Sequence, residues 1–126
     1  MLPARVLVID DDPKIRLVYE RVLTAEGYAV VSAATADEAL RLLGEVRPAA
    51  IFLDLKMPFV NGAGFLFRLR EQPEARGIPV AVITGASVDE ATVNDFRKLG
   101  ARVWYKPLSP EEISQVAKTL LPAPNT

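Results

Sequence analysis

The sequence contains no cysteine and no histidine among its 126 residues. Disulfide bonds, zinc sites built on cysteine or histidine, Ser-His-Asp triads and Cys-His nucleophiles are therefore excluded. A phosphohistidine carrier is excluded for the same reason. The lack of cysteine fits a reducing compartment, so we expect a cytoplasmic protein.

A strong charge imbalance and long apolar runs are also lacking. The 15 Lys and Arg residues nearly balance the 16 Asp and Glu residues, and the net charge of −1 gives no basic footprint for nucleic acid. No apolar run approaches the about 20 residues of a membrane span, and the N-terminus does not have the pattern of a signal peptide. We expect neither nucleic acid nor a membrane as a direct partner.

The sequence does contain enough apolar residues for one core. Half of the residues are hydrophobic and a quarter are charged. Set against roughly 150 residues per domain, the length predicts a single domain over residues 1–126. We place its core at about 5–121, with 122–126 as a short tail.

Short apolar runs alternate five times with amphipathic stretches. We expect strands at 5–9, 29–33, 49–53, 78–83 and 102–105. The stretch after the first strand has an apolar stripe with helical spacing, made of Ile15, Val18, Tyr19, Val22 and Leu23. Five strand–helix units predict an α/β fold with a doubly wound parallel sheet and helices on both faces.

Capping signals mark where several helices begin. Asp12 stands before Pro13, which suits an N-cap followed by proline at the first helical position. The segments Thr35–Glu38 and Ser109–Glu112 have the pattern of capping boxes. We also expect a helix from about 88 to 99, with Gly100 at its C-terminal end.

Polar side chains follow the apolar runs at the ends of alternate elements. They are Asp10 and Asp11, Asp54, Thr84, and Lys106. Each one alone is more often a cap, a strand-end hydroxyl or a solvated loop residue. Together they favour a site, because ligands of open parallel sheets bind at the carboxyl ends of the strands.

Carboxylates at neighbouring strand ends would lie about 5 Å apart and repel one another unless a cation or a proton relieves them. With no histidine or cysteine, the ligands are all oxygens, which favours Mg²⁺. A site with Mg²⁺, the ammonium of Lys106 and the hydroxyl of Thr84 is equipped to hold a phosphoryl group.

These motifs occur in a familiar order: 6–13 (VLVIDDDP), 53–58 (LDLKMP) with Asn61-Gly62, 79–85 (PVAVITG), Gly100-Ala101 and Lys106-Pro107. In this order the chain resembles the receiver domain of two-component response regulators over about 5–121. The resemblance implies a flavodoxin-like five-stranded sheet in the order 2-1-3-4-5, flanked by five helices.

The resemblance also implies a role for each site residue. Asp54 would be the phosphoacceptor, taking a phosphoryl group from a sensor histidine kinase or a histidine phosphotransfer protein. Thr84 and Lys106 would contact the phosphoryl oxygens, and the Lys106–Pro107 bond would be cis. The signal would pass to a downstream protein or an output domain through the face of the fourth helix, fifth strand and fifth helix. Whether the active form is a homodimer stays open.

The cofactor implied by the resemblance is Mg²⁺. Asp11 would bind it directly, Asp10 mostly through water, and Asp54 and the backbone carbonyl of Lys56 would complete the protein ligands.

The sequence departs from the family pattern after the fifth strand begins. Val103 stands where members usually carry the aromatic ring that turns inward on activation. A short, stiff β-branched side chain cannot act in that way. Tyr105 should share the face of Val103, and Trp104 should fill the core on the other face. Gly85 replaces the commoner alanine, and Asn61 replaces an aspartate in a turn.

Two other functions are weighed against this switch. A Mg²⁺-dependent phosphatase of the haloacid dehalogenase type also uses an aspartate nucleophile, but needs an acid two residues later, where this chain has Lys56. A flavin-binding domain would need a phosphate loop where this chain has three acids in a row. We therefore expect a signalling switch rather than an enzyme, with the phosphatase as the alternative.

Overall fold

The computed structural model describes residues 3–55, 62–85 and 88–121, in which strands and helices alternate. The strands are β1 (Arg5–Ile9), β2 (Ala29–Ala33), β3 (Ala50–Leu55), β4 (Val80–Thr84) and β5 (Ala101–Tyr105). The helices are α1 (Pro13–Ala25), α2 (Ala36–Val46), α3 (Gly62–Glu71), the 3₁₀ helix η1 (Pro73–Ala75), α4 (Glu90–Lys98) and α5 (Pro110–Leu120).

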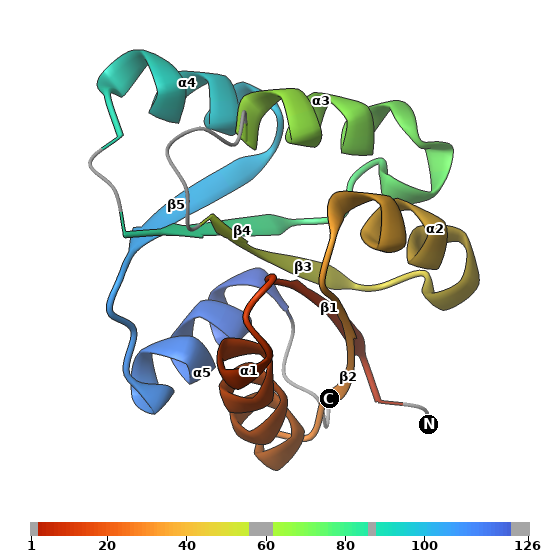
Figure 1. The fold of residues 1–126 in the computed structure, drawn as a ribbon, viewed down its shortest axis with the longest axis vertical. Coiled ribbons are helices and arrows are strands. Elements are labelled where there is room, and N and C mark those ends of the chain that lie inside the picture. The colour runs from red at the N-terminus through yellow and green to blue at the C-terminus, as the bar shows by residue number, and fades with distance from the viewer. Residues whose placement is uncertain (1–2, 56–61, 86–87, 122–126) are drawn as a thin grey trace.

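The strands form one parallel sheet in the order β2-β1-β3-β4-β5. This order confirms the predicted doubly wound fold. Figure 1 shows α1 and α5 on one face of the sheet and α2, α3 and α4 on the other. Each face has its own apolar core, and the central strands β1, β3 and β4 contribute buried side chains to both.

Local side-chain contacts fix where the helices begin. Ser109 and Glu112 form the predicted capping box at the start of α5, with both reciprocal hydrogen bonds present. The box predicted at Thr35 is only half formed. Thr35 accepts from the backbone N–H of Glu38, but the Glu38 side chain accepts from the N–H of Ala34. Thr35 is therefore the N-cap of α2, and the returning bond from Glu38 reaches one residue before it.

The boundaries of β3, β4, β5 and α4 differ from the prediction. β4 covers Val80–Thr84 rather than 78–83, and β5 begins at Ala101 rather than at 102. β3 continues through Asp54 to Leu55, because the ladder with β4 extends to the pair Leu55 and Thr84. The helix α4 begins at Glu90 rather than near 88, because the carboxylate of Asp89 accepts a hydrogen bond from the N–H of Thr92. The 3₁₀ helix η1 was not predicted.

None of the helices in the described part of the chain is long and apolar enough to cross a lipid bilayer.

Candidate functional site at the carboxyl edge of the sheet

Two aspartates lie side by side at the carboxyl edge of the sheet. β1 and β3 pair with Val8 opposite Phe52, and both residues face the core under α1 and α5. Side chains alternate along a strand, so Asp10 and Asp54, two residues further on, belong to the same face. Both are buried, with exposed fractions of 2% for Asp10 and 8% for Asp54.

Lys106 brings a cation to this edge. It directly follows β5, and its ammonium forms an ion pair with Oδ1 of Asp54, whose side chain is almost fully buried. The backbone N–H of Lys106 donates to the carbonyl oxygen of Thr84 at 2.9 Å, which joins the ends of β4 and β5. Thr84 is itself buried at 3% exposure. The Lys106–Pro107 bond is cis, as predicted.

The segment after β1 shapes the surroundings of Asp10. Its Oδ1 accepts from the backbone N–H of Asp12 at 2.8 Å, and its carbonyl oxygen accepts from the guanidinium of Arg16 at 2.6 Å. Asp12 caps α1 by accepting from the N–H of Lys14, as the sequence predicted. Asp11 lies between them and is exposed to solvent.

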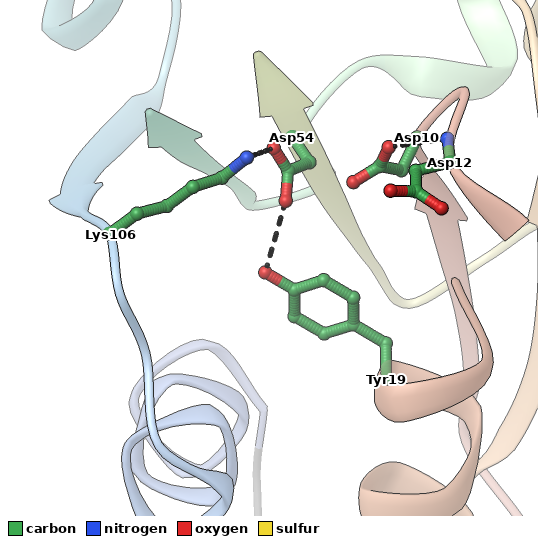
Figure 2. A network of polar contacts seen from close by, with 5 residues as sticks. All are labelled: Asp10, Asp12, Tyr19, Asp54 and Lys106. Carbon is green, nitrogen blue, oxygen red and sulfur yellow. Dashed lines mark hydrogen bonds and ion pairs between the residues drawn. The ribbon is translucent and has the colours of Figure 1, made fainter. Parts of the chain in front are cut away.

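Tyr19 is a site residue that the sequence analysis missed. Its hydroxyl donates to Oδ2 of Asp54 at 3.4 Å, from the α1 side of the site (Figure 2). Burial raises the pKa of Tyr19, and the charges of Asp54 and Asp10 raise it further. Helical spacing marked this residue only as part of the apolar stripe. Its hydroxyl was the available signal, because a buried tyrosine usually finds a hydrogen-bond partner.

The chemistry of the donor set fits Mg²⁺. Asp10 and Asp54 provide buried carboxylate oxygens at the ends of adjacent strands, and Asp11, the next residue after Asp10, is exposed to solvent. Hard cations of this kind are held by one or two carboxylates together with water. Within residues 3–55, 62–85 and 88–121, no three acidic side chains gather closely enough to form a metal-binding group. Lys56, whose carbonyl was predicted as a ligand, lies outside the described residues.

The aromatic residues of β5 lie on the predicted faces. Val103 packs against the core under α2, α3 and α4, and Trp104 packs against the opposite core. Tyr105 is half exposed, at 50%, and lines a surface pocket with Val103 and the α4 residues Val93 and Arg97. Tyr105 thus directly precedes the site residue Lys106 in the sequence, but its ring is half exposed to solvent.

The arrangement brings a buried carboxylate, an ammonium and a strand-end threonine to one edge of the sheet. A family model described as "Response regulator receiver domain" matches residues 6–118. The chain belongs to this family. As a receiver domain it is a signalling module of two-component systems rather than a classical enzyme.

Individual relatives show the same likeness. The receiver domain is 31% identical over 123 residues to sporulation initiation phosphotransferase F of Bacillus subtilis, covering 97% of each chain. The structure of the chemotaxis protein CheY4 of Vibrio cholerae is similar to it with a TM-score of 0.83, at 30% identity and covering 94% of this chain and 99% of that one.

Longer relatives contain a region like this receiver domain. It is 34% identical over 122 residues to the probable transcriptional regulator ycf27 of Porphyridium aerugineum, covering 96% of this chain and 49% of that protein. The chain thus spans about half the length of several curated relatives that it matches.

Proposed function

We propose that Asp54 accepts a phosphoryl group from a sensor histidine kinase or a histidine phosphotransfer protein, and that the domain acts in the cytoplasm. The observation that carries this proposal is the ion pair between the buried carboxylate of Asp54 and Lys106. A carboxylate at a strand end, near a cation that can neutralise incoming oxygens, is a nucleophile in a site suited to phosphate.

In the proposed reaction, an oxygen of Asp54 attacks phosphorus and the bond from phosphorus to the donor breaks. The leaving group of the donor takes the electron pair. The ammonium of Lys106 turns from the carboxylate to a phosphoryl oxygen, and the hydroxyl of Thr84 donates to another. Both contacts to the phosphoryl oxygens become stronger as negative charge spreads over these oxygens. Such sites stabilise the transition state in this way.

The proposed cofactor is Mg²⁺, held directly by Asp11 and Asp54, through water by Asp10, and by the carbonyl of Lys56. When bound, it neutralises charge on the carboxylates and on the phosphoryl oxygens.

Phosphorylation would then work as a switch. The phosphoryl group carries about −1.5 to −2 charges, in place of the single charge of the Asp54 carboxylate. Near-complete switching needs about 5.5 kcal/mol of differential stabilisation, more than a single charge-assisted hydrogen bond supplies, so Thr84 and Lys106 must both favour the active state. The backbone N–H of Lys106 donates a hydrogen bond to the carbonyl oxygen of Thr84. A movement of either residue would therefore shift the ends of both β4 and β5.

The proposed output surface is the face of α4, β5 and α5. A pocket of about 330 Å³ between α4 and β5, which Tyr105 and Arg97 line, gives this face a shape that a downstream protein or output domain can recognise. With Val103 in β5, we expect the signal to travel through loop movement rather than ring rotation. We also propose that residues 1–126 contain a single receiver domain, with its core at about 5–121.

The phosphatase alternative has less support. The family to which the chain belongs is one of signalling switches. Position 56, where such an enzyme carries its general acid, is a lysine.

The test is phosphorylation by a small donor. Incubation with acetyl phosphate and Mg²⁺ should add one phosphoryl group, detected by intact mass and lost in base. Asp54→Asn should abolish the mass shift. Asp95→Asn, an equivalent change on the exposed surface of α4, is the matched control and should retain it. A mass shift that persists in Asp54→Asn would show that the acceptor lies elsewhere.

A further inference from the structure

Tyr19 is packed at the base of the candidate site. Its side chain is only 3% exposed. Its ring packs edge-on against Phe52, with centroids 5.7 Å apart and an interplanar angle of 60°. Because Phe52 lies two residues before Asp54 on the same face of β3, this packing aims the hydroxyl at the Asp54 carboxylate.

Tyr19 and Lys106 contact different oxygens of one carboxylate. Figure 2 shows Lys106 reaching Asp54 from the end of β5, while Tyr19 approaches from α1. The hydroxyl donates to Oδ2, and the ammonium pairs with Oδ1. Tyr19, Asp54 and Lys106 all line a pocket of about 270 Å³. Its other walls include the apolar side chains of Ile15, Leu108 and Ile113. Apolar surroundings strengthen a hydrogen bond to a charged group.

We propose that Tyr19 is a positioning residue that holds Oδ2 of Asp54, leaves Oδ1 to attack phosphorus, and shortens the lifetime of the aspartyl phosphate. This inference rests on the proposed role of Asp54 as acceptor. Burial and the nearby carboxylates raise the pKa of Tyr19, so its hydroxyl keeps the proton that it donates.

The effect on lifetime follows from where the charge lies. In the phosphorylated state, Oδ2 is the carbonyl oxygen of an acyl phosphate and carries little charge. During hydrolysis the oxygen of water bonds to phosphorus, the bond between phosphorus and Oδ1 breaks, and the electron pair returns to the carboxylate. Both protons of the attacking water leave with the phosphate, as dihydrogen phosphate. A hydrogen bond to Oδ2 strengthens as the carboxylate charge returns, so it accelerates this step.

The same hydrogen bond slows phosphorylation, because it stabilises the Asp54 carboxylate that must act as the nucleophile. Hydrogen bonds to charged groups are roughly twice as strong as neutral ones, and 3.4 Å is a long contact. We therefore expect Tyr19→Phe to lengthen the half-life of the phosphoryl group by about threefold to tenfold. Phosphorylation by acetyl phosphate should become modestly faster.

The experiment compares the wild type with two phenylalanine variants. Each protein is phosphorylated with acetyl phosphate and Mg²⁺, the donor is removed, and loss of the phosphoryl group is followed by intact mass. Tyr28→Phe is the matched control, because Tyr28 is equally buried in the same core. Its half-life should stay within about twofold of the wild type.

A donor-strength series separates this role from a packing role. The chain has 3 tyrosines, at positions 19, 28 and 105. In a Tyr28→Phe/Tyr105→Phe background, biosynthetic replacement of the remaining tyrosine by 3-fluorotyrosine makes the hydroxyl a stronger donor. The half-life should then fall below that of the unfluorinated background, although the ring hardly changes in size.

The outcomes distinguish this inference from the proposed function. Equal or shorter half-lives in Tyr19→Phe, with the wild type phosphorylated normally, would overturn the role of Tyr19 alone. A fluorinated protein with an unchanged half-life would do the same. Phosphorylation of Asp54→Asn, or none in the wild type, would overturn the acceptor assignment and this inference with it.

Discussion

Replacing Lys106 with methionine removes the ammonium that pairs with Asp54 and retains an unbranched side chain of similar length. The aspartate side chain is 1% exposed and the lysine side chain 25% exposed. In the variant, the carboxylate keeps the Tyr19 hydroxyl as a donor but loses its cationic partner. Lys106→Met therefore tests whether the pair compensates a buried charge.

The expected cost can be bounded from the burial of the two groups. Removing one partner of a fully buried ion pair costs about 3–5 kcal/mol, because a charge is left without compensation. Here Lys106 is partly exposed, so water has some access to the pair, and Tyr19 still donates to the carboxylate. We expect Lys106→Met to lower the free energy of unfolding by about 2–3 kcal/mol at neutral pH.

The assay is urea denaturation in buffer with a metal chelator. For a slope of about 2 kcal/mol/M, the midpoint should fall by roughly 1–1.5 M. The control is the same change in an Asp54→Asn background, where no buried carboxylate loses its cationic partner. There the free energy of unfolding should fall by less than about 1 kcal/mol.

The difference between the two backgrounds measures the coupling between Lys106 and Asp54. A coupling below about 0.5 kcal/mol, or an equal loss of stability in both backgrounds, would refute the inference that Lys106 compensates the buried acceptor.

Four further predictions concern metal binding, two glycines and the pH dependence of stability. Mg²⁺ binding, measured by titration calorimetry, should weaken more in Asp11→Ala than in Asp10→Ala, because a direct ligand costs more to lose than one acting through water. Gly85→Ala should change stability by less than about 0.5 kcal/mol, since the added Cβ would meet only the Lys106 stem at 3.7 Å. Gly100→Ala should lower the free energy of unfolding by more than about 1 kcal/mol in the same urea assay. At Gly100 φ is +78°, and a guanidinium nitrogen of Arg70 lies 2.9 Å from the added Cβ. Above about pH 10 the unfolded chain loses the Tyr19 proton while the folded chain keeps it, so stability should fall as the pH rises. Thermal melts between pH 8 and about pH 11 should show a smaller decline in Tyr19→Phe than in the wild type.

Much of the local structure follows directly from the sequence. β1 and β2 have the predicted bounds, and the caps at Asp12 and Ser109 form as predicted. These features depend on neighbours within a few residues. Apolar runs, N-cap oxygens and proline at the first helical position act locally, and the sequence displays them directly.

Features that depend on a neighbouring strand could not be read in the same way. The apolar run before Asp54 predicts that β3 ends at residue 53, yet the strand includes Asp54 because β4 continues the ladder beside it. The strand order was likewise implied by the resemblance to a family and not by periodicity. Alternation of strands and helices is compatible with more than one order, since the pairing partners are chosen across the sheet.

The sequence by itself determined the strand–helix alternation and the class of chemistry, because four of the five apolar runs are followed by an oxygen ligand or a cation while histidine and cysteine are absent. Only the tertiary structure decided which groups meet. The pairing of β1 with β3 sets Asp10 beside Asp54, and the pairing of β4 with both β3 and β5 brings Lys106, at the end of β5, to the same carboxylate. Tyr19 completes the site although 35 residues separate it from Asp54, because α1 packs across the face that both share. A helical stripe can mark a side chain as buried, but the partner of its hydroxyl depends on the packing of helix against sheet.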